Sequence, residues 1–414
     1  MRLLATVILT ILLSVWVEKV SAQTDSILVT GQDTIRYTYT PIAMPAVEKA
    51  DTIAVKPKKN NIFRRIVRYF AESSIDKSFE KKLDFTFVLG PYYSNSTSLG
   101  LGVLASGLYR IDRENRTLPP SSFSVYVNAS IIGMYKVGIE SVSIFKDDKN
   151  RLFGDLSFMS MPTDFWGLGY TDAVHNTSTR YTSNRYQINV KYLHRLFRNT
   201  YAGACLNFDY TAAKRLKHPE YLHGQKSAYN ATGLAILIEY DSRDFIPNPS
   251  KGVFLSVEQL FRPRFANNTG HNLWRTRITA DYYHKLWKGA TVAVDLYGEI
   301  NSKTTPWVFY AQMGGTKRMR GYYEGRFTDL NVVMAQVEIR QRIWRRIGMT
   351  VWGGAGNVFP SFESFDWGQT MPNYGLGLRW EFKNRVNVRF DFGMGRKVQG
   401  KMINGFLMSI NEAF

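Results

Sequence analysis

The amino-acid sequence predicts an all-β fold, a 16-stranded antiparallel transmembrane β-barrel preceded by a short N-terminal amphipathic helix. From residue 83 to residue 414, apolar and polar side chains alternate with a period of two, as they do where one face of each strand meets lipid and the other faces a lumen. Aromatic residues make up 14% of the chain, and many stand at strand ends, where barrels carry aromatic girdles. After the first residues, no stretch approaches the roughly 18 apolar residues of a transmembrane helix, which excludes a helical membrane protein.

The alternation is clearest near the C-terminal end of the chain. In the segment 386–393 the even positions are apolar and the odd positions are polar or small. Asp391 is therefore expected to face the lumen, and Phe390 the lipid. In the segment 374–382 the expected lumen face carries Gly375, Gly377, Arg379 and Glu381.

The spacing of the strands supports the predicted number. Divided among sixteen strands, residues 83–414 leave about 21 residues for each strand and its connection, which suits strands of roughly ten residues. If both ends of the barrel lie on the periplasmic side, every second connection should be short. Most connections obey this rule, but 110–120 and 241–252 are long exceptions. The last strand is expected to run from 404 to 414.

The first 22 residues are typical of a secretory signal peptide. Arg2 supplies the positive end, residues 3–16 form an apolar run, and residues 20–22 form a small-x-small cleavage site. The alternative is a membrane anchor. A run of about 14 apolar residues is short for spanning a bilayer, so cleavage after Ala22 is expected.

Two segments are expected between the signal peptide and the barrel. Residues 23–60 are rich in Thr, Pro, Val and Lys without a sustained period and predict a flexible periplasmic lead. Residues 61–82 carry apolar side chains at intervals of three and four with arginines between them, which predicts a basic amphipathic helix. That helix could lie on the inner leaflet, plug the barrel, pair with a second copy to form a homodimer, or simply pack on the barrel rim.

Several function classes find no support in the sequence. The single cysteine, Cys205, allows no internal disulfide, so stability is expected from barrel closure. The net charge of +19 is dispersed over turns and strands, so nucleic acid is not an expected partner. There is no Gly-x-Ser-x-Gly motif, and His218 and His223 lack the neighbours of a metal site. We expect no enzymatic activity and no cofactor.

The longest expected outer loop, residues 302–329, contains Arg320-Gly321-Tyr322, in which an aromatic residue directly follows Arg-Gly. Three further stretches follow a matching order along residues 83–414. These are a loop with Asp241, Arg243, Asp244 and Gly252; a strand with Gly375 and Gly377; and Phe390-Asp391-x-Gly393. The set resembles the motifs of the BamA/TamA superfamily (bacterial surface antigen family) of outer-membrane assembly and translocation barrels.

The resemblance implies that the Arg320 loop folds back into the lumen and that Arg320 contacts the strand motifs. Asp391 is the expected acceptor, and Glu381 is a second candidate. The two glycines, Gly375 and Gly377, leave space for an incoming loop. A charge-assisted contact stabilises by roughly 1.5 to 3 kcal/mol. We therefore predict a loop lock, meaning the contact between Arg320 and Asp391; the alternative is that Arg320 is an ordinary solvated loop residue.

The C-terminal end of the chain also resembles that family. Phe414 follows apolar residues at alternate positions, beginning with Phe406. A terminal aromatic residue on an amphipathic last strand looks like the signal by which such barrels are themselves inserted. A compatible alternative is an aromatic anchor at the periplasmic interface.

The resemblance implies a function as well as a fold, although the sequence departs from the family pattern in two places. It places the protein in the outer membrane of a Gram-negative bacterium, beside lipid and lipopolysaccharide, with outer-membrane proteins as clients. The segment 23–82 is too short for the usual periplasmic POTRA domains, which indicates a short form. Gly354 also stands where relatives often carry Asp. Two hypotheses follow: a barrel that inserts or translocates envelope components through a seam between its first and last strands, or a structural barrel or passive pore without that activity.

Overall fold

The structure is a computed structural model that describes residues 78–115, 118–383 and 386–414. The predicted signal peptide (1–22), the lead (23–60) and most of the predicted helix (61–77) lie outside the described residues. Residues 78–82, the last part of that helix prediction, form turns and bends.

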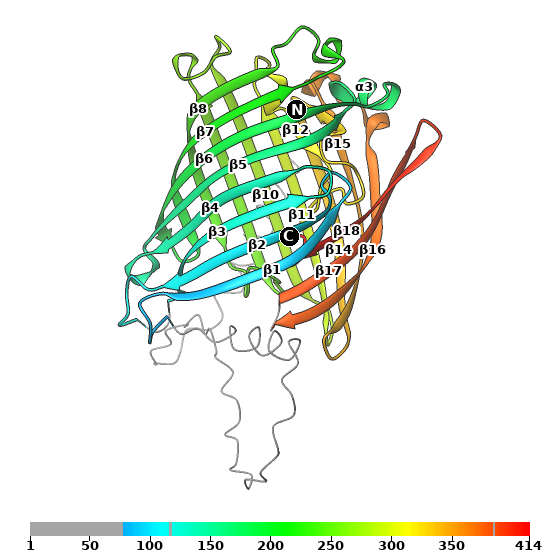
Figure 1. Cartoon of the computed structure of the whole chain (residues 1–414). Helices are drawn as coiled ribbons and strands as arrows, with labels where there is room; N and C mark the ends of the chain where they lie inside the picture. The colour runs from blue at the N-terminus through cyan, green and yellow to red at the C-terminus, as the bar shows by residue number, and fades with distance from the viewer. Residues whose placement is uncertain (1–77, 116–117, 384–385) are drawn as a thin grey trace, which may run out of the picture. The chain divides into compact units, whose positions relative to one another are not determined.

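A closed barrel of sixteen antiparallel strands occupies the described part of the chain (Figure 1), which confirms the predicted fold class. Each strand pairs with its sequence neighbour, except that β11 pairs with β14, because β12 and β13 form a separate two-stranded sheet. The barrel strands are β1 (Asp84–Ser94), β2 (Ser98–Tyr109), β3 (Ser121–Ser130), β4 (Tyr135–Ile144), β5 (Asn150–Phe165), β6 (Thr179–Phe197), β7 (Thr200–Lys214), β8 (Ala228–Asp241), β9 (Gly252–Arg262), β10 (Leu273–Lys285), β11 (Ala290–Asn301), β14 (Asn331–Trp344), β15 (Ile347–Phe359), β16 (Met371–Lys383), β17 (Val386–Val398) and β18 (Lys401–Ile410).

The remaining elements are short and lie in connections. They are β12 (Ala311–Met313), β13 (Phe327–Asp329), the helix α3 (Gly169–His175) and the 3-10 turns η1 (Lys146–Asp148), η2 (Pro219–Leu222), η3 (Arg264–Ala266), η4 (Trp307–Phe309), η5 (Phe362–Ser364) and η6 (Trp367–Gln369). Among the described residues, no helix has the length and apolar character needed to cross a membrane.

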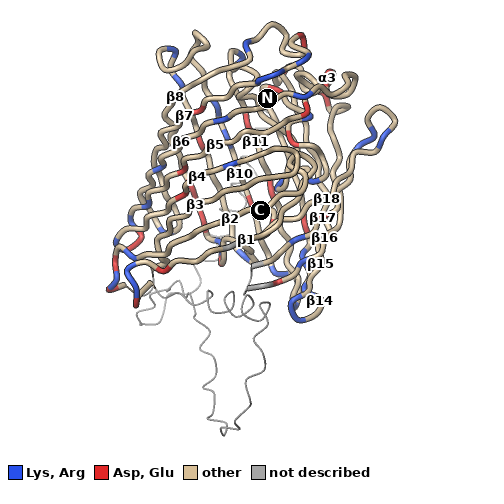
Figure 2. Tube along the Cα trace, viewed as in Figure 1, with Lys and Arg blue, Asp and Glu red and all other residues tan. Residues whose placement is uncertain are grey.

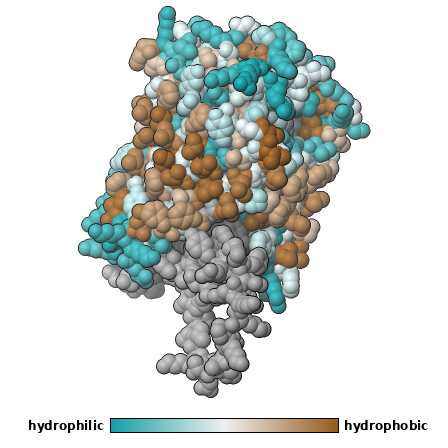
Figure 3. All heavy atoms as spheres, viewed as in Figure 1, coloured by the Kyte–Doolittle hydropathy of each residue, from teal (hydrophilic) through white to brown (hydrophobic). Residues whose placement is uncertain are grey.

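The predicted alternation appears as two faces of each strand. In β8, Leu234, Ile236 and Ile238 are 55%, 65% and 56% exposed, whereas Ala235 and Leu237 between them are buried. Large apolar side chains exposed in a row are stable only where lipid covers them. Figure 3 shows such side chains over the barrel wall, between hydrophilic ends.

The end of the last strand differs from the prediction. β18 covers residues 401–410 instead of 404–414, and residues 411–414 leave the barrel wall. The chain bends at Asn411, whose φ is +66°. The physical reason is Glu412, because its carboxylate is buried against the Arg379 guanidinium. A buried carboxylate needs charged partners, and Glu412 finds one inside the barrel.

The wall of the barrel is uneven around its circumference. Strands β5 to β8 have 14 to 19 residues, whereas β1 to β4 have 10 to 12. The pairing is uneven as well. β1 is aligned with β2 from Asp84–Leu108 to Ser94–Ser98, but among the described residues it is aligned with β18 only at Tyr93–Met408.

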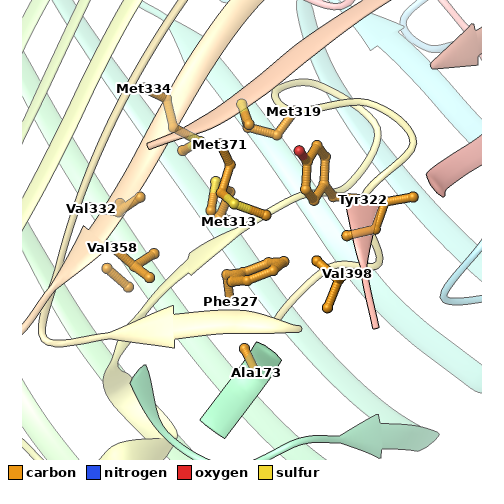
Figure 4. Packing of buried hydrophobic residues seen from close by; sticks show 12 residues of the cluster. Ala173, Met313, Met319, Tyr322, Phe327, Val332, Met334, Val358, Met371 and Val398 are labelled. Carbon is orange, nitrogen blue, oxygen red and sulfur yellow. The ribbon is translucent and has the colours of Figure 1, made fainter. Parts of the chain in front are cut away.

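The principal apolar cluster lies inside the barrel, around the connection between β11 and β14. Figure 4 shows Met313, Met319, Tyr322 and Phe327 of this connection gathered together. They pack against side chains of the barrel strands, including Val332, Met334, Val358 and Met371. The barrel therefore closes around one of its own loops, and this loop positions the candidate site.

Candidate functional site

The connection 302–330 folds back into the lumen and presents Arg320-Gly321-Tyr322 to the strands of the wall. β12 and β13 pair antiparallel between the two ends of this connection and hold them together. Between them the chain turns sharply at Met319 (φ +49°) and Gly321 (φ +100°). The hairpin base and the turn together hold Arg320 at a fixed depth in the barrel.

Arg320 is fully buried, and its side chain contacts three strands of the wall. Its Nη1 donates to Asp391 Oδ2 on β17 over 2.9 Å, and its Nη2 donates to Glu338 Oε2 on β14 over 2.5 Å. Its guanidinium carbon lies 3.6 Å from the ring centre of Trp352 on β15. A planar guanidinium suits this combination of two carboxylates and one aromatic face. The structure thus brings together the two residues of the predicted loop lock.

The second predicted acceptor was wrong. Glu381 lies near the end of β16 and accepts from Arg342 over 2.7 Å, whereas Arg320 donates to Asp391 and Glu338. Glu338 takes its place because it is fully buried and faces Arg320 from β14. The alternation of Val337, Glu338 and Ile339 already placed Glu338 on the lumen face, so the signal was present in the sequence.

Glycines on β16 and β17 make the close approach of the loop possible. A Cβ on Gly393 would lie 2.0 Å from the Arg320 carbonyl oxygen, so the loop backbone rests directly on this residue. Gly375 and Gly377 make room for the loop indirectly. A Cβ at these positions would collide with the side chains of Trp352 and Asp391, which contact Arg320. The space predicted at Gly375 and Gly377 therefore admits the residues that hold the loop, and Gly393 admits the loop itself.

Tyr322 adds a neutral anchor next to Arg320. Its hydroxyl donates to the Pro372 carbonyl over 2.7 Å and accepts from the Arg396 backbone N–H over 2.9 Å. Burial raises the pKa of this hydroxyl to about 12, so it keeps its proton and its donor role at neutral pH. The ring lies against Gly395, where a Cβ would be 2.2 Å from the hydroxyl oxygen.

A second ionic anchor was missed by the sequence analysis. Arg318 donates from Nε and Nη2 to the carboxylate of Asp295 on β11, over 2.7 and 2.5 Å, and lies over the ring of Tyr297. Gln336 donates to the same carboxylate over 2.9 Å. Asp295 lies on the polar face of its strand, but nothing in the local pattern pairs it with Arg318.

Ionic contacts continue from the loop lock to the C-terminal residues. Arg379 donates to Asp391 Oδ1 over 2.5 Å and to Glu412 Oε2 over 2.7 Å. Arg340 donates to Glu338 over 2.6 Å and to the Phe414 backbone oxygen over 2.9 Å. The tail formed by residues 411–414 is thus connected to Arg320 through two arginines.

The anchor role considered for Phe414 is therefore wrong. Its ring lies 5.3 Å from the Arg340 guanidinium and 6.4 Å from the ring of Tyr283, which faces the lumen. Phe406 behaves differently, because it is 43% exposed on β18 and its ring lies 5.8 Å from that of Tyr93 across the seam. Whether either residue serves as an insertion signal stays a prediction.

The motif with Asp241, Arg243, Asp244 and Gly252 forms a separate folded loop between β8 and β9. Arg243 pairs with Asp241 over 2.8 Å, Asp244 accepts from Ser250, and Gly252 adopts a φ of +114°. This loop touches the tail, since the Pro247 carbonyl accepts from the Glu412 backbone N–H over 3.1 Å. The motif does not contact Arg320 directly.

Asn95 connects the loop to the seam. It lies in the turn between β1 and β2, and its Nδ2 donates to the Gly321 carbonyl and to the Asn404 carbonyl of β18, each over 3.0 Å. Nothing in the sequence pattern singled it out. In the part of the chain that the structure describes, no group of three or more His, Cys, Asp or Glu is placed to hold a metal ion.

Comparison with known proteins agrees with this geometry. A family model described as the Omp85 superfamily domain matches residues 121–414. The chain belongs to the Omp85 superfamily. This membership confirms the resemblance drawn from the Arg320, Asp391 and glycine motifs. No curated protein matches the chain.

Solved structures similar to this Omp85 barrel share its fold at low sequence identity. BamA from Haemophilus ducreyi lacking POTRA domains 1-3 has a TM-score of 0.57 and 11% identity, covering 80% of this chain and 70% of that one. CdiB from Acinetobacter baumannii has a TM-score of 0.53 and 14% identity, covering 79% and 60%. CdiB from Escherichia coli has a TM-score of 0.54 and 10% identity, covering 84% and 70%.

Proposed function

We propose that this barrel lies in the outer membrane of a Gram-negative bacterium and inserts or translocates envelope components, with outer-membrane proteins as clients. In this proposal the end where β1 begins and β18 ends faces the periplasm. The seam between those two strands opens sideways while the loop lock keeps the neighbouring strands β14 to β17 in place. The observation that carries the proposal is the contrast between the buried Arg320 cluster and the sparsely paired seam.

The energetics of pairing favour the seam as the opening site. Each backbone hydrogen bond of a ladder contributes roughly 0.5 to 1.5 kcal/mol net. Separating β1 from β2 breaks a ladder that runs the length of both strands, whereas the seam is aligned at the single pair Tyr93–Met408. Opening between β1 and β18 therefore costs least and exposes two strand edges that can pair with another chain.

No observation favours the alternative of a passive pore. A pore needs a continuous water path, but residues 302–330 occupy the lumen and bury Met313, Arg320 and Phe327 completely. Trp307 and Phe309 of the same connection pack with aromatic residues of β5, β6 and β8. Anchored side chains of this connection thus occupy part of the lumen.

A reversible block of the seam tests the proposal. In a Cys205→Ala background, Tyr93→Cys and Met408→Cys join the seam under oxidation, and Val103→Cys with Val127→Cys joins the aligned strands β2 and β3 as a control. We expect vesicles with the joined seam to stop inserting an unfolded client barrel and to recover after reduction, while the control pair has no effect. Full insertion through a joined seam would contradict the proposal.

A further inference from the structure

Two neighbouring turns form one surface at the end of the barrel where β1 begins and β18 ends. We call residues 285–288 and 342–347 the basic rim. The first segment joins β10 to β11 and the second joins β14 to β15, and β11 is paired with β14. Trp287 Nε1 donates to Gln341 Oε1 over 2.8 Å, and the Arg342 backbone N–H donates to the Gly289 carbonyl over 2.8 Å. The two turns are therefore held together as a unit.

The basic rim exposes large apolar side chains. Trp287, Trp344 and Ile343 are 61%, 59% and 55% exposed. These residues follow directly on the lipid-facing positions of the strands, such as Ile339 on β14. Tryptophan prefers the level of lipid headgroups, where its ring meets the acyl boundary and its N–H stays polar. The rim thus lies at the membrane interface.

The same surface carries an excess of positive charge. The basic residues are Lys285, Lys288, Arg342, Arg345 and Arg346, all exposed. Glu381 is the one carboxylate that pairs with any of them among the described residues, and it contacts Arg342 over 2.7 Å. Five positive charges against one negative charge leave a local excess of four. Figure 2 shows this basic cluster at the lower end of β14.

We infer that the basic rim binds an anionic glycerophospholipid, such as phosphatidylglycerol, from the leaflet at this end of the barrel. The headgroup phosphate meets the guanidinium groups of Arg342, Arg345 and Arg346, and the acyl chains lie against Ile343 and Trp344. The Arg345 guanidinium lies 4.8 Å from the Trp344 ring centre, which places a cation at the apolar boundary where a phosphate would sit. Basic residues next to a membrane surface attract anionic lipid in this way.

The inference explains part of the net charge of +19 and does not rest on the proposed insertion activity. The positive charges of the rim repel one another, which raises the free energy of the folded barrel. Bound lipid phosphates offset this repulsion. A protein partner would not require Trp287, Trp344 and Ile343 at the acyl boundary. The ligand is therefore assigned to lipid.

The test compares the lipids retained by two variants with equal loss of charge. The rim variant carries Arg342→Gln, Arg345→Gln and Arg346→Gln. The control carries Lys214→Gln, Arg215→Gln and Lys217→Gln, three exposed basic residues at the end of β7 and in the loop that follows it, at the other end of the barrel. Full-length proteins are incubated in micelles with equal amounts of phosphatidylglycerol and phosphatidylcholine, and bound lipid is measured by native mass spectrometry. Heat-modifiable migration on gels verifies that each barrel is folded.

We expect the wild type and the control to retain phosphatidylglycerol in preference, and the rim variant to lose this preference by roughly tenfold. Trp344→Ala should reduce total bound lipid while keeping the preference, because it leaves the charges in place. Two results would overturn the inference: an unchanged preference in the rim variant, or an equal loss of preference in the control.

Discussion

The wall formed by β14 to β17 and the seam between β18 and β1 differ in how strongly their strands are held together. β16 and β17 are aligned from Asn373–Gly395 to Lys383–Val386, and β14 to β17 carry the partners of the Arg320 loop. The seam has one aligned pair among the described residues. The difference shows that this protein places the buried ionic contacts of Arg320 on β14 and β17 and leaves one junction weakly joined.

The two regions are nevertheless connected. Arg379 on β16 holds both Asp391 of the loop lock and Glu412 beyond β18. At the other end of β18, Asn95 holds both Gly321 of the loop and Asn404. Displacement of the loop should therefore weaken the seam at both ends of β18.

The largest expected effect is that of Arg320→Ala. The change removes a buried charge from Asp391 and Glu338, which keep Arg379 and Arg340 as partners. Loss of one partner from a buried ionic group costs roughly 3 kcal/mol. We expect a lower unfolding temperature and faster tryptic cleavage within 302–330, measured on the folded barrel in micelles. The unfolding temperature of Arg320→Lys should lie between those of the wild type and Arg320→Ala, since lysine keeps the charge but lacks the planar guanidinium.

Asp391→Arg provides the complementary change at the loop lock. It places a fifth positive charge among Arg320, Arg340, Arg379 and Arg389 and should destabilise the barrel at least as strongly as Arg320→Ala. If both variants keep the wild-type unfolding temperature and protease resistance, the loop lock does not exist.

Gly393→Ala should have the next largest effect on the stability of the wall formed by β14 to β17. Its added Cβ would lie 2.0 Å from the Arg320 carbonyl, so the loop must move, and overpacking of this kind costs roughly 1 to 3 kcal/mol. Gly353→Ala on β15 is the matched control, because its Cβ would meet no atom within 4 Å. Equal unfolding temperatures for the two variants would show that the loop does not rest on β17.

The sequence predicts the wall much better than it predicts the connection to the seam. A period of two determines which side of a strand faces lipid, so the strands and the lumen position of Asp391 could be predicted from local pattern alone. Glu338 faced the lumen by the same rule, but choosing it over Glu381 required knowing how deep the loop enters. Asn95, Glu412 and the Arg318–Asp295 pair depend on contacts between distant segments, which no local period encodes.

Glu412→Gln should loosen the pairing of β18 while leaving β15 unchanged. The change removes the negative charge that pairs with Arg379 just after β18 ends, and it keeps the shape of the side chain. The expected loss of folding free energy is roughly 1 to 2 kcal/mol. We expect faster hydrogen exchange in β18 and unchanged exchange in β15. Glu381→Gln is the control, because Glu381 also pairs with an arginine but on the outside of this network. Equal hydrogen exchange in both variants would show that the tail does not stabilise the seam.

The smallest expected effect is that of Asn95→Asp, which keeps the size of the side chain and removes the Nδ2 donor. Both hydrogen bonds that join Gly321 to Asn404 are lost, for about 1 kcal/mol in this partly exposed turn. Hydrogen exchange should therefore increase at the start of β18, near Asn404, and not at its end near Ile410, where Arg379 still holds Glu412. Faster exchange along the whole of β18 would instead mean that Asn95 supports the entire seam. No change would mean that β14 to β17 are connected to the strand that opens through Arg379 and Arg340 and not through Asn95.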